Sequence, residues 1–250
     1  EVAQIDQAKH ILSREDDDAA EILQRVFVRE GIRLFLSAEV KQARRDGAEK
    51  VLRIVRDGRE EALRVDEILV GAGRAPNVEG LNLDAVGVEY DRDGVRVDDG
   101  LRTTNRRIFA AGDVCMRHKF THMADVAARI VIQNALFFGR KKLGAVHVPW
   151  CTYTDPEIAH VGMYERDARG AGIDIEHYTR SFEHVDRAIL DGEEQGFAKV
   201  MVKKGTDRIL GATIVARHAG EMISEVTLAM VSGTGLGALA AVVHPYPTQA

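Results

Sequence analysis

Hydrophobic positions in the first part of the chain follow helical spacing and then strand spacing. Apolar residues three and four apart predict an amphipathic helix over residues 14–30, with Ser13 as its cap and Asp16 as the acid of a capping box. Gly31 stands where a left-handed residue would end this helix. Strands are predicted on both sides of it, over residues 1–6, 33–42, 50–56, 61–65 and 66–70.

The middle of the chain contains loops and one strong helical pattern. Turn formers dominate residues 81–100, with a short strand at 95–97. A strand over residues 108–111 leads to a helix that begins near Thr121 and has many small residues, which is typical of tight packing against a sheet or a cofactor. Gly139 and basic residues after it end this helix.

The segment His147-Val148-Pro149 marks a boundary, because strands and helices of a different arrangement follow it. Strands are predicted over residues 151–153, 159–162, 175–181, 197–203 and 209–215. Helices are predicted over residues 164–171, 219–232 and 236–242. Strands with helices on one side indicate an α+β domain.

Composition indicates a soluble globular protein. The chain has 250 residues, 45% of them hydrophobic, which suffices for a packed core. Its net charge of -5 is modest and its basic residues are scattered, so we expect neither a nucleic acid nor a membrane as partner. Cys115 and Cys151 lie far apart, which suggests neither a CxxC pair nor a disulfide framework and fits a reducing, cytoplasmic compartment.

The first candidate for chemistry is Asp113, which follows Gly112 at the end of an apolar strand and precedes a helix. A carboxylate in this place, beside a glycine that lets a ligand approach, suits the hydroxyl groups of a polyol. Taken alone, the pattern is better explained by a helix cap or a turn. Upstream, a second apolar strand breaks into the glycine-rich turn Gly71-Ala72-Gly73.

Together with four downstream motifs, these segments resemble the flavin- and nicotinamide-dependent disulfide oxidoreductases, the family of glutathione reductase, dihydrolipoamide dehydrogenase and mercuric reductase. The downstream motifs are Thr154–Gly162, Ile209–Ala212, Ala219–Glu221 and His244–Thr248. The family's flavin fingerprint and its closely spaced redox cysteines are not in this sequence, so we interpret the chain as the C-terminal piece of a longer enzyme.

The resemblance implies an α/β plus α+β fold, in which partial Rossmann-like dinucleotide-binding domains precede an α+β dimerisation domain. The implied domains are the second half of an NAD(P)-binding domain over residues 1–73, the end of an FAD-binding domain over 74–146, and the dimerisation domain over 147–250. A homodimer is expected to form through this last domain.

The resemblance also assigns cofactor roles. The aspartate matching Asp113 hydrogen-bonds the ribityl chain of FAD, and the helix after it points its N-terminus at the flavin ring. His122, Met123 and Ala124 would line that edge of the ring. Gly71, Ala72 and Gly73 would let the backbone approach the nicotinamide of NAD(P)H, although an ordinary tight turn explains them too.

Asp6 ends the opening strand, where an acid accepts hydrogen bonds from the ribose of NAD and repels the 2′-phosphate of NADP. This gives a weak preference for NADH. The alternative is that Asp6 is a solvated loop carboxylate, with Lys9 and His10 close enough to blur its charge.

The C-terminal motif departs from the family pattern, in which a histidine directly before Pro-Thr exchanges protons with the redox thiols. Here Tyr246 precedes Pro247-Thr248, and His244 lies two residues earlier. Because the ordinary pKa of tyrosine is about 10 and that of histidine about 6.5, tyrosine is the poorer proton shuttle. Tyr246 could instead bind a substrate or a metal ion, or His244 could take the catalytic role.

We expect no resident metal site, although Cys115, His118 and His122 have a spacing that could reach a metal if they were helical. The family implies hydride transfer from nicotinamide to flavin, and then electron transfer to a thiol, a disulfide or a metal ion. The chain alone is expected to be inactive. The alternative is a non-catalytic dimerisation or scaffold module, which the apolar region 219–243 favours.

Overall fold

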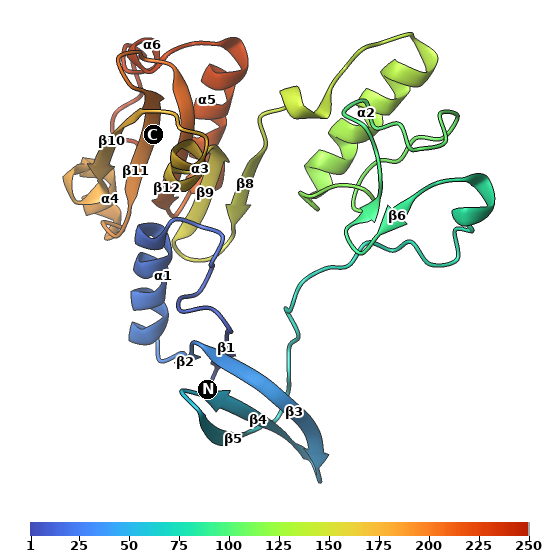
Figure 1. Cartoon of the computed structure of the whole chain (residues 1–250). Coiled ribbons are helices and arrows are strands. Elements are labelled where there is room, and N and C mark those ends of the chain that lie inside the picture. The colour runs from blue at the N-terminus through green and yellow to red at the C-terminus, as the bar shows by residue number, and fades with distance from the viewer. Residues whose placement is uncertain (250) are drawn as a thin grey trace. The chain divides into compact units, whose positions relative to one another are not determined.

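The computed structural model describes residues 1–249, which form two compact units. One unit joins residues 1–69 to the segment from Pro149 onward, and the other contains residues 70–148 (Figure 1). No helix within residues 1–249 has the length and apolar character needed to cross a bilayer. The finer division into three domains stays a prediction.

The first unit opens with two parallel strands and the helix between them, β1 (Ala3–Ile5), α1 (Asp17–Arg29) and β2 (Arg33–Phe35). An antiparallel meander follows, β3 (Ala38–Asp46), β4 (Glu49–Arg56) and β5 (Arg59–Val65). The turn Asp57-Gly58 has φ values of +51° and +73°, as a two-residue hairpin of type I′ requires. The predicted helix between two strands and the predicted hairpins after it are therefore confirmed.

The helix α1 has the predicted apolar face and end, but not the predicted start. It buries Ala19, Ala20, Leu23 and Val26, and Gly31 after it has φ +84°. Its N-cap residue is Asp16, so the expectation that Ser13 caps the helix was wrong. The reason is tertiary, because Lys199 binds Asp16 and Asp18, each at 2.8 Å, and fixes the first turn.

Two predicted strands of the first unit are also wrong. The strand expected over residues 33–42 is two strands, because Ser37 has φ +51° and turns the chain out of the extended conformation. The strand expected over residues 66–70 does not form, and Leu69 and Val70 are 98% and 78% exposed. An apolar run becomes a strand only where a neighbouring strand accepts its hydrogen bonds.

The second unit contains one long helix packed on loops. Its elements are η1 (Asp84–Val86), β6 (Tyr90–Asp91), β7 (Gly94–Val95), α2 (Thr121–Leu136) and η2 (Leu143–Ala145). Leu101, Met116, Met123, Ala127 and Ile130 form its core. The strand expected over residues 108–111 is reduced to a single bridge between Arg102 and Phe109, again for want of a paired strand.

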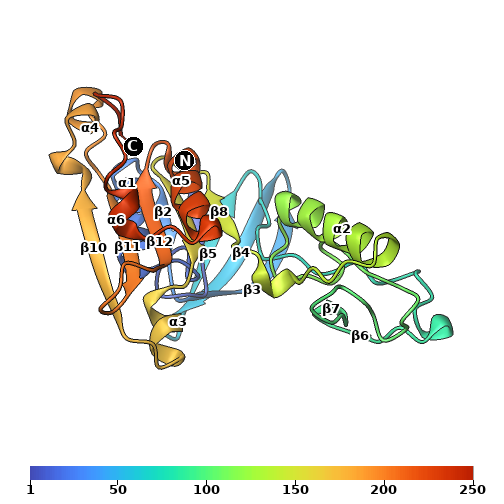
Figure 2. The same cartoon turned by 90° about the horizontal axis from the view of Figure 1, so that it is seen from above.

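An antiparallel sheet of five strands dominates the rest of the first unit, in the order β10-β11-β12-β9-β8. The strands are β8 (Pro149–Thr152), β9 (Glu157–Gly162), β10 (Ile175–Ser181), β11 (Phe197–Lys203) and β12 (Ile209–Ala216). The helices are α3 (Glu165–Gly170), η3 (Phe182–His184), α4 (Asp186–Asp191), α5 (Ala219–Ser232) and α6 (Leu236–Leu239). Figure 2 shows α5 alongside these strands. The predicted α+β fold is confirmed, although α4 was not predicted.

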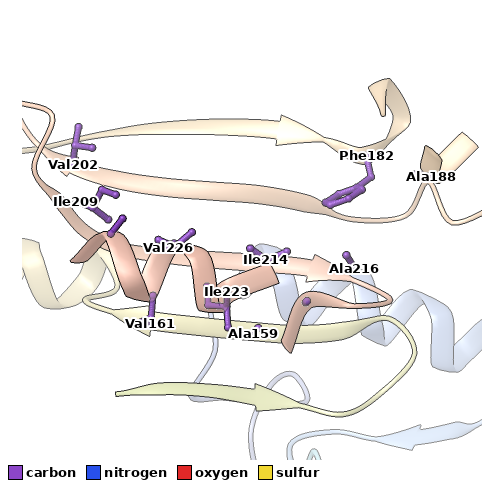
Figure 3. Packing of buried hydrophobic residues seen from close by; sticks show 13 residues of the cluster. Ala159, Val161, Phe182, Ala188, Val202, Ile209, Ile214, Ala216, Ile223 and Val226 are labelled. Carbon is purple, nitrogen blue, oxygen red and sulfur yellow. The ribbon is translucent and has the colours of Figure 1, made fainter. Parts of the chain in front are cut away.

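The central strand β12 is buried on both faces. On one face, Ile214 and Ala216 join Ala159, Ile223 and Val226 in the core under α5 (Figure 3). On the other face, Val215 packs with Ile158 and Phe197. Ile11, Ala19 and Leu23 complete this second cluster, so the segment before α1 and α1 itself cover the face opposite α5.

A buried polar cluster attaches this N-terminal segment to the sheet. The carboxylate of Glu15, 5% exposed, accepts hydrogen bonds from Trp150 Nε1 at 3.0 Å and from the hydroxyl of Tyr164. The ring of His160 stacks on Tyr164 with centroids 3.6 Å apart. A neutral imidazole satisfies both of its ring contacts, because Nε2 donates to the carbonyl of Gly162 at 3.2 Å and Nδ1 accepts from Thr213 Oγ1 at 2.8 Å.

The stability of the first unit should depend on this imidazole staying neutral. Burial lowers the pKa of His160 to about 3. The unfolded chain therefore binds the proton first, so stability is retained above the unfolded pKa and lost as pH falls towards the folded one. We expect the loss from this residue to be about 2 kcal/mol at a pH of about 5. Urea unfolding across this pH range measures it.

The matched comparison uses His160→Gln and His177→Gln, since His177 is exposed. His160→Gln should flatten the pH dependence, while His177→Gln should leave it unchanged. Equal slopes for both variants and the native chain would show that His160 is not buried as a neutral ring.

Candidate functional site

The two glycine-bearing motifs of the second unit meet in the structure. The guanidinium of Arg74, which directly follows the turn Gly71-Ala72-Gly73, lies with Nη1 3.5 Å from Asp113 Oδ2. The same nitrogen donates to the backbone carbonyl of Lys119 at 3.0 Å, just before α2. The turn, the aspartate and the start of α2 therefore form one cluster.

A glycine outside both motifs permits this approach. Gly94 has φ +121°, and a Cβ there would lie 2.2 Å from the carbonyl oxygen of Val114 and 3.3 Å from Pro76 Cβ. The neighbouring amide of Val95 donates to that carbonyl at 2.8 Å. A side chain at position 94 would therefore displace the segment that carries Asp113.

Gly112 shapes the backbone before the aspartate. It has φ +83°, and a Cβ there would approach Ala124 Cβ to 3.3 Å, so Gly112 packs against the first turns of α2. Its carbonyl accepts from the amides of Cys115 and Met116, each at 3.1 Å. The side chain of Asp113 is left 45% exposed, neither buried nor fully solvated. Its carboxylate can thus accept hydrogen bonds from a ligand.

The predicted residues at the start of α2 do not all face the same way. Met123 is 2% exposed and packs in the core, so only its backbone can meet a ligand. Ala124 contacts Gly112, while His122 is exposed and stacks on Phe120 with centroids 5.3 Å apart. Phe120, the N-cap residue, makes no side-chain cap, and the first turn of any helix has amides without intrahelical acceptors.

The turn Gly71-Ala72-Gly73 is exposed, and Gly73 has φ +117°. A Cβ at Gly71 or Gly73 would meet no atom of the protein within 4 Å. Space beside the backbone is therefore open here, as the approach of a ligand requires.

Asp6 directly follows β1, which ends at Ile5, and is half-buried. Its Oδ1 accepts from the amide of Ala8 at 2.8 Å, so one oxygen holds the turn and the other is left for a ligand. The side chain of His10 contacts Asp17 instead, with Nε2 3.2 Å from Oδ1. Asp6 and Asp113 belong to different units, and each is a separate candidate.

The C-terminal motif is held by two carboxylates of the first unit. His244 Nε2 lies 3.0 Å from Glu225 Oε1 on α5, and the hydroxyl of Tyr246 donates to Asp186 Oδ2 on α4 at 3.0 Å. This hydrogen bond raises the pKa of Tyr246 above its usual range. A groove of about 540 Å³ lies between α4, α5 and Pro247–Gln249. Tyr246 is 80% exposed and suits hydrogen-bond donation better than proton exchange.

Neither cysteine is set up as a reactive thiolate. Burial raises the pKa of Cys115 to about 11, and burial together with Glu157 raises that of Cys151 to about 12. No group of three or more histidine, cysteine or acidic residues suited to a metal occurs in the described part of the chain. His118 precedes α2, so its predicted helical spacing with His122 does not arise.

Sequence reasoning missed four residues that build these sites: Arg74, Gly94, Asp186 and Glu225. Arg74 directly follows the glycine turn, and its position was the available signal. Gly94 stood in a recognised turn, but its contact with Val114 is tertiary. Asp186 and Glu225 lie on helices far along the chain from the C-terminal motif, and nothing in the sequence indicated their pairing.

Comparison with known proteins covers nearly all of the chain. The family model described as pyridine nucleotide-disulphide oxidoreductase matches residues 1–128, and the model of that family's dimerisation domain matches residues 148–250. A mercuric reductase of Staphylococcus aureus is 32% identical over 100% of this chain and 46% of its own length. A dihydrolipoyl dehydrogenase of Thermus scotoductus is 33% identical over 99% of this chain and 54% of its own length.

A solved structure agrees with these matches. The HOCl-induced flavoprotein disulfide reductase RclA from Escherichia coli superimposes with a TM-score of 0.88 at 28% identity, over 100% of this chain and 57% of that one. The chain thus spans about half the length of the relatives that it matches. With both family models matched in order along it, the chain belongs to the pyridine nucleotide-disulphide oxidoreductase family.

Proposed function

We propose that this chain supplies the C-terminal half of an FAD-dependent NAD(P)H oxidoreductase of the disulfide reductase family. The observation that carries the proposal is that Arg74, directly after the Gly71–Gly73 turn, contacts both Asp113 and the carbonyl of Lys119 just before α2. Names of relatives support it, since they include mercuric reductases, dihydrolipoyl dehydrogenases and a flavoprotein disulfide reductase.

The residues present fit one end of a flavin. Asp113 offers a half-exposed acceptor for ribityl hydroxyls, and α2 offers backbone amides and the positive end of its dipole to the electron-rich ring. Bound flavin would take a hydride from nicotinamide and pass the electrons to the acceptor. Asp6 would bind the ribose of the nicotinamide cofactor, which favours NADH over NADPH.

For the acceptor, we propose a thiol, a disulfide or a metal ion, with Tyr246 as a hydrogen-bond donor to the substrate. The raised pKa of Tyr246 argues against a role as a base. His244, paired with Glu225, would hold the segment that carries Tyr246. We place the enzyme in the cytoplasm, where Cys115 and Cys151 stay reduced.

We also propose a homodimer through residues 147–250, in agreement with the dimerisation-domain match. Leu228 and Val231 lie on α5, 67% and 65% exposed, although α5 packs its other side on the sheet. Exposed apolar side chains on a buried helix favour a subunit interface. This observation equally supports the second candidate function, a non-catalytic dimerisation or scaffold module.

The purified chain should be colourless. Each hydrogen bond from Asp113 or α2 contributes about 1 kcal/mol net, while association costs several kcal/mol. Visible absorbance after incubation with FAD and desalting tests this, and a retained stoichiometric flavin band would contradict it.

Riboflavin titrated with an excess of the chain should lose fluorescence as it binds. Asp113→Ala should raise the Kd obtained from this quenching about fivefold, because one hydrogen bond is lost, whereas Asp6→Ala should not change it. Equal Kd values for the two variants would remove Asp113 from the flavin site.

Tyr246 should keep its proton to higher pH than an ordinary tyrosine, because the carboxylate of Asp186 accepts its hydrogen bond. Titration of the tyrosine ring carbons by NMR, with Tyr246→Phe to assign the signal, measures its pKa. Asp186→Asn should lower that pKa, and Asp191→Asn serves as the matched control on α4. A pKa of Tyr246 below the usual range of tyrosine would contradict this prediction and favour a role as proton shuttle.

Charges placed in the proposed interface should separate the subunits. Leu228→Glu with Val231→Glu would bury two carboxylates on association, so sedimentation velocity should show a dimer for the native chain and a monomer for this variant. Val28→Glu, at a 60% exposed position of α1, should leave the dimer intact. A monomeric native chain would contradict the proposed homodimer and the scaffold alternative alike.

A further inference from the structure

Strand β10 is an open edge of the five-stranded sheet. It stands at the end of the strand order, and within residues 1–249 it pairs only with β11 (Figure 2). The strand belongs to the matched dimerisation domain, but α5 packs mainly on β8, β9 and β12. An open edge offers a row of backbone donors and acceptors to another strand, so β10 is a surface distinct from that of α5.

The ladder between β10 and β11 shows which residues present these groups outward. Just beyond the two ends of β10, the amide of Lys204 donates to the carbonyl of Asp174 at 3.0 Å, and the amide of Phe182 donates to the carbonyl of Gly196 at 3.1 Å. The register between these two bonds has no shift. Because bonded pairs alternate along an antiparallel ladder, the even-numbered residues of β10 bond to β11. The odd-numbered residues therefore point their amides and carbonyls away from the sheet.

Strand β10 lacks the features that commonly protect such an edge. Its seven residues include no proline, glycine or lysine, and no bulge interrupts its pairing with β11. Residues 176–180 are all exposed. Natural edge strands are often short, bulged, or interrupted by proline or lysine, whereas β10 is long enough and regular enough to pair along its whole length.

The two charged residues of β10 complement each other about the middle of the strand. Glu176 and Arg180 lie on the same face, at equal spacing on either side of Tyr178. Neither forms an ion pair in the described part of the chain, although Arg180 Nη2 donates to the carbonyl of His184 at 2.8 Å. Two antiparallel copies of β10 related by a two-fold axis at Tyr178 would place Glu176 of each copy opposite Arg180 of the other.

The hydrogen-bonding pattern selects the same register. Outward-facing residues are odd-numbered, so a bonded contact between two copies pairs odd residues with odd residues. An axis at Tyr178 does this over the whole strand, with His177 opposite Thr179. An axis at His177 or at Thr179 would leave two residues of β10 beyond the other copy's strand and would part Glu176 from Arg180. The unbonded pairs, whose side chains lie closest, are then Glu176 with Arg180 and Tyr178 with its own copy.

We propose that β10 is a second self-association surface, to which another copy of the chain adds its own β10 in antiparallel orientation. The contact joins the two five-stranded sheets edge to edge and goes beyond the homodimer proposed through α5. It is small, so its Kd should be about 0.1 to 1 mM. Sedimentation at about 10 μM therefore reports the α5 interface alone, and the β10 contact adds to it near about 1 mM.

Charge reversal tests the contact in the chain that carries Leu228→Glu and Val231→Glu, where the α5 interface is disabled. Sedimentation equilibrium up to about 1 mM protein, in about 0.15 M salt to screen the net charge of -5, should show a monomer and a dimer. Adding Glu176→Arg or Arg180→Glu should raise the Kd about tenfold, because like charges then face each other, and both reversals together should restore it. Glu194→Arg and Arg208→Glu, at exposed positions outside β10, are the matched controls.

A backbone substitution tests the strand pairing itself. Thr179→Pro removes an outward amide and spares the ladder with β11, so it should abolish the association, while Thr179→Val should keep it. No association at about 1 mM, or equal association by these two variants, would overturn the proposal. So would a double reversal that binds no better than the single ones, since β10 would then pair in another register or with another segment. None of these outcomes bears on the oxidoreductase function proposed above.

Discussion

The first unit depends on one constraint, a central strand that must be covered on both faces. Residues of β12 alternate between the α5 core and the cluster under α1, and almost none of them reaches solvent. An antiparallel sheet with one open face would have an alternating polar strand here instead. The segment from Ile11 to Leu23 is therefore part of the same packing unit as the dimerisation sheet, although more than a hundred residues separate them in sequence.

Covering the second face also buries polar side chains, and the buried polar cluster around Glu15 supplies their hydrogen-bond partners. Thr213 points its hydroxyl into this face from β12, and His160 accepts from it. Burial keeps the imidazole neutral, while the carboxylate of Glu15 is compensated by the indole and phenol donors around it. Each buried polar group of the cluster thus has its partner, and the pairing also fixes the register between the N-terminal segment and the sheet.

Elements whose signals are local were predictable. The ends of β10, β11 and α5 agree with the sequence-based expectation, since alternation sets the strands and Gly233, at φ +70°, ends the helix. The strands expected over residues 66–70 and 108–111 failed because pairing is not local. The turn at Ser37 was not predictable either, because its positive φ occurs at a residue other than glycine.

In the candidate site, too, the local motifs were predictable from the sequence and the contacts between them were not. Asp113 and the glycine turn stand out in the sequence, but the contact between them runs through Arg74 and depends on Gly94, and both require the tertiary structure. Met123 shows the opposite case. Its spacing of four and seven residues from Ala127 and Ile130 places it on the core face, so helical periodicity already indicated that its side chain could not line a ligand.

The protonation states of the two cysteines and of Tyr246 favour binding over proton exchange at the candidate sites. Cys115 and Cys151 stay thiols at neutral pH because partial burial raises their pKa. Tyr246 keeps its proton because its hydroxyl donates a hydrogen bond to the carboxylate of Asp186. None of these three groups is prepared to give up a proton during a reaction. The described residues are instead suited to bind and orient a ligand. Asp6 and Asp113 offer hydrogen-bond acceptors, and Tyr246 and the first amides of α2 offer donors. Under the function proposed above, this half of the protein would hold the cofactors and substrate in place, and the groups that exchange protons with the acceptor would be other than these three.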